Sequence, residues 1–194
     1  MRASHFEFYN GFGWPWLDIC ARVDVTDALI LGSDCGVGVF ASCLFQIMKA
    51  LNSVPALRLR IEGDSVVQYD ACSPSFTVKG RDELFNFACA DWSDDLVSFA
   101  SRVKEASTVA AGKQNLDLSN EARGDLVFVT CLPWVDFTSI QHPRSLGPTP
   151  DSTPRIAWGK LTECSVGRKT MPLSISVHHG LVDGVHIAEF LRAI

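Results

Sequence analysis

The sequence contains no run of about eighteen apolar residues, the length that a helix needs to span a bilayer, so we expect no membrane partner. It is also poor in cations, with 17 Lys and Arg against 22 Asp and Glu and a net charge of −5. A nucleic-acid backbone is bound by clustered Lys and Arg, so this balance argues against nucleic acid as a partner. An anionic cofactor stays compatible, because it needs only a few local cations.

The seven cysteines include no CxxC pair, and most stand in apolar surroundings. An odd number of scattered thiols is more typical of buried, reduced cysteines than of disulfides or a zinc site. The first residues also lack the apolar stretch of a secretion signal. We therefore expect a cytoplasmic protein.

Hydrophobic residues make up 47% of the chain and charged residues 20%, which suits one folded domain over residues 1–194. Runs rich in Val, Ile, Leu and Phe, several of them alternating with polar residues, predict strands. These runs are 18–25, 56–62, 65–71, 75–79, 125–132, 155–164 and 171–179. The Gly and Asp of the EGDS segment between the second and third runs predict a hairpin turn.

Helical patterns occupy residues 37–53 and 91–107. The second has acids in its first turn and cations in its last, as the helix dipole favours. A third helix should start near Asp183 and Gly184 and continue to the end of the sequence. Together these elements predict an α+β fold, a two-layer sandwich with a mixed, mostly antiparallel sheet covered by helices.

The segment SISVHHGLVDGVHIAEF, residues 174–190, places three histidines and an aspartate close together after an alternating run. A metal site is one interpretation, because His179, Asp183 and His186 would share one face of a continuous helix. Against it, Gly180 and Gly184 interrupt any helix, and we find no second cluster of ligands in the sequence.

Two other interpretations of this segment remain. The histidines could be satisfied core residues at a strand end. Alternatively, a histidine held at the strand end could take a proton from a hydroxyl and return it to a leaving group, because its unperturbed pKa lies near neutral pH. This acid/base interpretation fits better, with Asp183 pairing with a cation to lock the loop and Gly184 permitting a tight backbone path.

The segment HHGLVDG (178–184) matches the HHxxxDG motif of CoA-dependent acyltransferases, and the chain resembles the trimeric type of chloramphenicol acetyltransferase. The resemblance runs through several segments in order, over nearly the whole chain. These segments are SHFEFY (4–9), FTVKGRDELFNF (76–87), SDDLVSF (93–99), CLPWVDFTS (131–139) and MPLSISVHHGLVDGVHIAEF (171–190).

The resemblance implies an acetyl-CoA-dependent O-acetyltransferase that needs no metal and transfers acetyl to an acceptor hydroxyl in a ternary complex. It also implies a homotrimer with each active site between two subunits, the histidine coming from one subunit and most of the acceptor pocket from its neighbour. Larger acyltransferases with this motif hold two such halves in one polypeptide. A single copy therefore takes its opposite wall from another subunit, and closed cyclic symmetry provides it.

The resemblance implies four residues of the catalytic machinery. His179 is the general base, and Thr130 stands where the family has a serine hydroxyl that stabilises the oxyanion. Asp183 matches a structural aspartate that pairs with an arginine, here Arg2. Alternatives stay open for two of them: Thr130 also suits a strand by propensity alone, and Arg2 lies so near the terminus that it could make no fixed contact.

The acceptor pocket carries departures from the family pattern. Tyr9 and Phe85 align with aromatic residues of that pocket, whereas Leu17 stands where another aromatic is expected. His142 lies near a position that is usually leucine. Because contacts with the acceptor set specificity, these departures bear on which alcohol is used rather than on acetyl transfer itself.

On the cofactor side, Lys160 aligns with a lysine near the polar end of CoA, although an exposed lysine has many other uses. Leu161 stands where an aromatic usually stacks on the adenine, and Ala157 replaces a hydroxyl residue. Chloramphenicol is the first acceptor to consider, with another hydroxylated small molecule as its rival. A non-catalytic ligand-binding trimer of the same fold is a second alternative, and the acyltransferase core of a dehydrogenase complex a third, although the lipoyl and linker segments that normally precede such a core are not seen.

Overall fold

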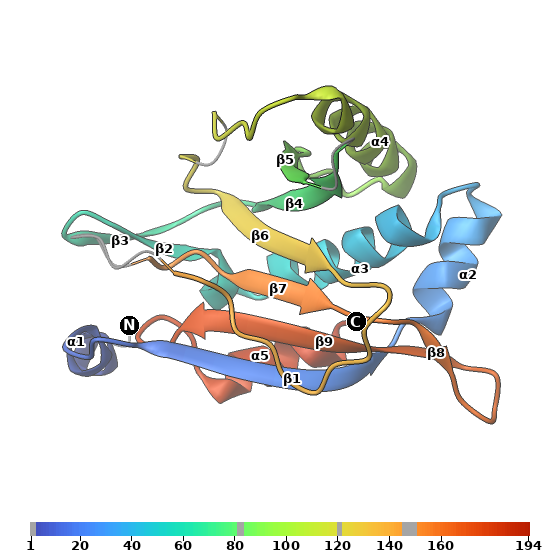
Figure 1. Cartoon of the computed structure of the whole chain (residues 1–194). Helices are drawn as coiled ribbons and strands as arrows, with labels where there is room; N and C mark the ends of the chain where they lie inside the picture. The colour runs from blue at the N-terminus through green and yellow to red at the C-terminus, as the bar shows by residue number, and fades with distance from the viewer. Residues whose placement is uncertain (1–2, 81–83, 120–121, 145–150) are drawn as a thin grey trace.

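A seven-stranded mixed sheet forms one layer of the molecule (Figure 1), and the structure, a computed structural model, describes residues 3–80, 84–119, 122–144 and 151–194. The strands follow the order β1-β9-β7-β6-β4-β5, with β8 beside β9. The parallel pairs are β4 with β6 and β6 with β7, and the other pairs are antiparallel. The strands are β1 (Trp16–Asp24), β4 (Ser73–Lys79), β5 (Phe85–Cys89), β6 (Leu126–Cys131), β7 (Arg155–Trp158), β8 (Thr162–Glu163) and β9 (Lys169–His178).

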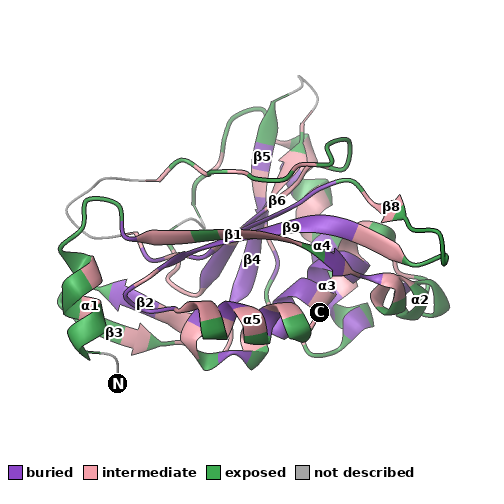
Figure 2. Cartoon of the chain, turned by 90° about the horizontal axis from the view of Figure 1, so that it is seen from below, coloured by how far each residue is buried: buried purple, intermediate pink, exposed green. Residues whose placement is uncertain are grey.

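Helices form the second layer, on one face of this sheet (Figure 2). They are α1 (Ala3–Asn10), α2 (Thr26–Asp34), α3 (Val39–Ser53), α4 (Leu96–Gly112) and α5 (Gly184–Arg192), with a 3₁₀ turn η1 (Pro55–Arg58). A separate antiparallel hairpin pairs β2 (Leu59–Glu62) with β3 (Ser65–Gln68). The predicted α+β sandwich with a mixed, mostly antiparallel sheet is confirmed.

The alternation along β9 decides which face of the sheet packs on the helices. Leu173, Ile175 and Val177 are fully buried in the hydrophobic core with the apolar face of α3. Ser174 and Ser176 therefore point to the opposite face, because successive side chains of a strand alternate. No helix of the described residues covers that face in Figure 1, and the segment after β6 crosses it in front of β9 and β1. We call it the open face.

The ends of some predicted elements were wrong. The predicted strand 56–62 begins only at Leu59, because Pro55 fixes the start of a 3₁₀ turn instead. The predicted strand 155–164 is interrupted after Trp158, where a side chain at Gly159 would collide with the carbonyl oxygen of Val135.

Helix 91–107 was also misplaced, since α4 starts after Asp95, whose side chain accepts a hydrogen bond from the backbone N–H of Ser98 at 2.8 Å. The acids ahead of Asp95 thus lie outside the helix. The short elements α1, α2 and β5 were not among the predicted elements.

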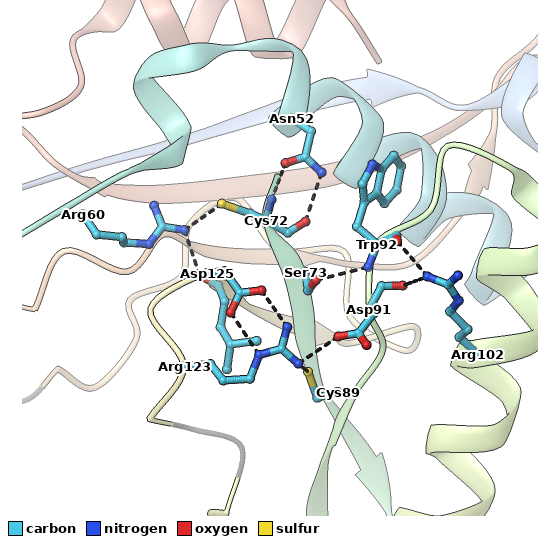
Figure 3. Close-up of polar contacts among 11 residues, drawn as sticks. Asn52, Arg60, Cys72, Ser73, Cys89, Asp91, Trp92, Arg102, Arg123 and Asp125 are labelled. Atoms are coloured by element: carbon cyan, nitrogen blue, oxygen red, sulfur yellow. Dashed lines mark hydrogen bonds and ion pairs between the residues drawn. The ribbon is translucent and has the colours of Figure 1, made fainter. Parts of the chain in front are cut away.

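A polar network fixes the starts of β4 and β6 (Figure 3). Arg60 is 2% exposed, and its Nη2 donates to Cys72 Sγ at 3.2 Å and to the carbonyl oxygen of Leu126 at 2.8 Å. The side chain of Asn52 bonds both the N–H and the carbonyl oxygen of Cys72. Because buried polar groups are costly unless hydrogen-bonded, this network pins the β2–β3 hairpin and α3 to the sheet.

Among the described residues, no helix is long and apolar enough to cross a membrane. All seven cysteines are free thiols, and Cys43 and Cys72 are buried.

Candidate active site

His179 is held in one tautomer directly after β9. Its backbone N–H donates to the carbonyl oxygen of Pro15 at 2.7 Å, and its Nδ1 lies 3.1 Å from the carbonyl oxygen of Val182. A carbonyl oxygen only accepts, so Nδ1 carries the proton and Nε2 keeps its lone pair. The ring of Tyr9 stacks on the imidazole with centroids 4.0 Å apart. The arrangement suits a base that acts through Nε2.

Asp183 caps α5. Its Oδ1 accepts a hydrogen bond from the N–H of Gly184 at 2.7 Å, and its own N–H donates to Nδ1 of His186 at 3.0 Å. His186 therefore closes a capping box, with its Nδ1 lone pair already used. Among the described residues, no three His, Cys, Asp or Glu side chains group closely enough to hold a metal ion. The predicted partner of Asp183, Arg2, lies outside the described residues.

Unlike its partly exposed neighbour His179, His178 is buried. It is 1% exposed, and burial, followed by the nearby Arg144, lowers its pKa to about 4. Its Nδ1 accepts the N–H of Gly180 at 3.2 Å, and a Cβ at Gly180 would lie 3.0 Å from the imidazole. His178 is thus a buried, neutral histidine on the open face, and of these two neighbours His179 is the one that stays partly exposed.

A hollow of about 800 Å³ on the open face gathers three of the predicted site residues, Phe85, Thr130 and His142. Its walls come from β4, β5, β6, β7 and the segment after β6. The described residues that line it are Thr77, Lys79, Phe85, Phe87, Phe128, Thr130, Cys131, Leu132, Trp134, His142, Pro143 and Arg155.

Thr130 and His179 lie far apart within one chain. Thr130 is opposite Ala157, which is opposite Ser174, and His179 follows Ser174 by five residues (179 − 174). At about 3.3 Å per residue and about 4.8 Å per strand, the separation is on the order of 19 Å. His179 and Tyr9 are at one end of the sheet, and the hollow with Thr130 is elsewhere on the open face, so one chain does not bring the base and the hydroxyl together.

The remaining predicted site residues, Lys160, Leu161 and Leu17, lie outside the lining of the hollow. Lys160 is exposed beyond the end of β7, and its N–H donates to the carbonyl oxygen of Val135 at 2.8 Å. Leu161 follows it and packs against the core. Both are near the start of β9, at the opposite end of that strand from His179. Leu17 pairs with Val177 and packs on the core from the helix-covered face, outside the hollow.

A buried charge cluster beside the hollow was missed in the sequence. The guanidinium of Arg155 lies 2.6 Å from a carboxylate oxygen of Asp151, and that of Arg144 lies 3.8 Å from the same oxygen. Arg144 also donates to Ser176 Oγ at 2.6 Å and lies over the ring of Trp16. An arginine that opens an apolar strand, as Arg155 does in RIAW, was the available signal.

The charges of this cluster act on the imidazole of His142. Burial, then Arg155 and Arg144, lower its pKa to about 4, against an opposing effect of Asp18. Its Nε2 is buried and makes no hydrogen bond among the described residues. His142 is therefore a neutral imidazole beside two arginines.

The geometry agrees with comparisons to known proteins. The family model for chloramphenicol acetyltransferase matches residues 1–194. Chloramphenicol acetyltransferase 3 of Escherichia coli is 26% identical over 197 residues, covering 100% of this chain and 91% of the relative. The chloramphenicol acetyltransferase of Bacillus pumilus is 20% identical over 196 residues, covering 99% and 87%.

Solved structures show the same relationship. A chloramphenicol acetyltransferase structure superposes with a TM-score of 0.86 at 26% identity, covering 99% of this chain and 92% of that one. The dihydrolipoamide acetyltransferase of Azotobacter vinelandii gives a TM-score of 0.68 at 18% identity, covering 98% and 83%, and shares the fold alone.

A mixed sheet with helices on one face, a histidine of fixed tautomer after its longest strand and these relatives together define an acyltransferase. The chain belongs to the chloramphenicol acetyltransferase family. The resemblance drawn from HHGLVDG is thereby confirmed.

Proposed function

We propose that the protein transfers acetyl from acetyl-CoA to the hydroxyl of a small molecule, with active sites shared between the subunits of a homotrimer. The observation that carries the proposal is the Nδ1–H of His179 donated to Val182, which leaves Nε2 as the proton acceptor. The separation of His179 from Thr130 supports the shared site, since two copies with closed symmetry can bring the two ends together.

In this mechanism, Nε2 of His179 removes the proton of the acceptor hydroxyl while the hydroxyl oxygen attacks the thioester carbonyl carbon. The carbonyl π electrons move to oxygen, and the hydroxyl of Thr130 from the neighbouring subunit donates a hydrogen bond to that oxyanion. Collapse of the tetrahedral species breaks the C–S bond, and His179 returns its proton to the departing thiolate. General-base catalysis of this kind contributes about a hundred- to ten-thousandfold.

The remaining site residues have supporting roles in this proposal. Asp183 fixes the turn after His179 by capping α5. The pairing of Asp183 with Arg2 that the family resemblance implies would tie the N-terminus to that turn. Tyr9 holds the imidazole by stacking and borders the acceptor on the histidine side. Phe85 and His142 border it within the hollow.

Lys160 and Leu161 contact CoA from the subunit that provides Thr130. Both follow β7 directly, and β7 pairs with the strand that carries Thr130. The exposed ammonium of Lys160 suits the phosphates of the cofactor, whereas Leu161 offers only apolar contact.

Mixing two inactive variants tests the shared site. His179→Ala and Thr130→Ala chains, each inactive or strongly impaired alone, are co-expressed in equal amounts. If the base and the hydroxyl belong to different subunits, about a quarter of the sites in random trimers regain both groups. Thiol release from acetyl-CoA, with chloramphenicol and a panel of other alcohols, measures the recovery. No recovery in a mixed trimer, or a fully active monomer in sedimentation, contradicts the proposal.

A further inference from the structure

Arg144 is a buried cation that no step of the proposed mechanism uses. Its side chain is 1% exposed, and its Nη2 donates to Ser176 Oγ at 2.6 Å. Its Nη1 donates to the carbonyl oxygen of Thr153 at 3.2 Å, and it shares the carboxylate of Asp151 with Arg155. Burial, followed by Arg155, lowers the pKa of Arg144 only to about 10, so the guanidinium is charged at neutral pH. Because a buried charge is costly even when it is paired, this position calls for a physical explanation.

The guanidinium of Arg144 lies over the indole ring of Trp16, the first residue of β1. Its carbon is 4.8 Å from the ring centroid, which is a cation–π contact. The indole N–H of Trp16 donates to the carbonyl oxygen of Asp151 at 3.0 Å. Trp16 is paired with His178 at the end of the β1–β9 ladder, so both side chains lie on the open face. The segment after β6 therefore holds Trp16 by two contacts, one to the ring and one to the indole N–H.

Pro15 connects these contacts to the proposed base. It directly precedes Trp16, and its carbonyl oxygen accepts the backbone N–H of His179 at 2.7 Å. Pro15 is buried, but residues 10–14, which lead into it, are all exposed, and α1 before them has no buried residue. Packing ahead of Pro15 thus gives its carbonyl little support, so the position of that carbonyl depends on how firmly Trp16 is held.

Resting on the proposed acetyl transfer, we propose that Arg144 is a positioning residue for His179. It contacts neither the acceptor nor the reacting atoms. It acts through Trp16 and Pro15 on β1, and through Ser176 on β9, the strand that leads directly to the base. The two strand ends are thereby kept at the separation that the hydrogen bond between Pro15 and His179 needs. A misplacement of about 1 Å can cost about a hundredfold in rate, so this contact bears directly on kcat.

Amide hydrogen exchange of the full chain tests the positioning without relying on turnover. Arg144→Met removes the cation and leaves Asp151 paired with Arg155, so we expect the variant to fold. The amide of His179 should exchange at least about tenfold faster, whereas amides in the middle of β9 keep their rates. The matched control is Arg102→Met, which removes an exposed arginine that also donates to two backbone carbonyls and leaves both rates unchanged. An unchanged rate at His179, or faster exchange along all of β9, overturns the inference.

Kinetics of thiol release separate positioning from acceptor binding. We expect Arg144→Met to lower kcat by about ten- to a hundredfold and to change the acceptor KM by no more than about threefold. Arg144→Lys keeps a cation beside Trp16 and Ser176 and recovers part of the rate. A raised KM with an unchanged kcat would assign Arg144 to the acceptor pocket, and the inference would be wrong.

A double variant tests whether the effect passes through the indole. Trp16→Leu removes the ring, leaves the ion pairs of the cluster intact, and carries the same test if Arg144→Met does not fold. We expect the combined variant to lose less than the product of the two single losses, because both changes break one contact. Losses that multiply fully would show that the two residues act independently, which contradicts the proposed route.

Mixed trimers show which side of the shared site is affected. When Thr130→Ala and His179→Ala chains are co-expressed, the intact base and the intact hydroxyl come from different chains. Arg144→Met on the chain with the intact His179 should lower the recovered rate about ten- to a hundredfold, and on the other chain no more than about threefold. Equal losses in both placements contradict the inference. If no mixture recovers activity but Arg144→Met still speeds exchange at His179, the shared site fails and the positioning stands.

Discussion

Nδ1 of His179 and the carbonyl oxygen of Val182, 3.1 Å apart, fix the proton of the imidazole on the nitrogen that faces the protein's own backbone. Both residues belong to the turn between β9 and α5, so the turn itself sets the chemistry of the ring. A side chain that orients a histidine can be replaced by mutation, whereas this backbone acceptor is preserved as long as the turn keeps its shape.

Replacing His179 by alanine removes the base. We expect thiol release from acetyl-CoA in the presence of an acceptor to fall by about a hundred- to ten-thousandfold. The matched control is His5→Ala, which removes an exposed histidine of α1 and leaves the rate unchanged. If the His179→Ala variant is as fast as the unchanged protein, His179 is not the general base.

Thr130→Val keeps the shape of the side chain and removes its hydroxyl. If the hydroxyl stabilises the oxyanion, kcat falls by about a hundred- to a thousandfold with KM little changed. Thr130→Ser restores the hydroxyl without the methyl and keeps most of the activity. Equal rates for the Val and Ser variants would show that the hydroxyl has no catalytic role and that Thr130 serves only the strand.

The stack of Tyr9 on His179 restrains the imidazole from the side. Tyr9→Ala is expected to lower kcat by up to about tenfold, because aromatic pairs contribute about 0.5–1.5 kcal/mol. Tyr9→Phe keeps the ring and stays near the original rate. If Tyr9→Phe is as slow as Tyr9→Ala, the phenolic hydroxyl rather than the stack is what matters.

The cap of α5 predicts a change in stability. Asp183→Ala removes the side chain that accepts the N–H of Gly184, and we expect the free energy of unfolding to fall by at least about 1 kcal/mol. Asp183→Ser retains a capping oxygen and recovers part of that loss. Chemical denaturation measures both variants. An unchanged unfolding midpoint in Asp183→Ala would show that the cap does not stabilise the protein.

Stability should fall as the pH drops from about 6.5 to about 4. Burial lowers the pKa of His178 to about 4, so in this range the unfolded chain binds a proton that the folded chain refuses. Each such histidine steepens the loss by up to about 1.4 kcal/mol per pH unit, and His142 acts in the same direction. Denaturation at several pH values shows this slope, and His178→Gln should flatten it.

Local sequence patterns predicted much of this fold. The alternation in MPLSISV predicted β9, and the Asp-Gly pair predicted the start of α5. The strand β5 (Phe85–Cys89) was not predicted because it is short and its buried residues are Asn86 and Ala88, whereas Phe85 is exposed, so its polarity pattern does not match its burial.

Some residues of the site could likewise be predicted from local sequence patterns, and others could not. His179 and Asp183 both lie within the short motif HHGLVDG, so a local pattern could point to both of them. The charge cluster forms only because the segment after β6 folds back over the open face. This brings two cations, Arg144 and Arg155, to one carboxylate, Asp151. No periodicity records such a contact, so sequence patterns alone could not reveal this cluster.

The distance between Thr130 and His179 has a consequence for inheritance as well as for catalysis. Under a shared-site assembly, a gene copy damaged at one of these positions yields chains that still lend the intact position to their neighbours. Two defective alleles can then complement each other in the same cell, whereas a change that weakens association between chains silences every site at once.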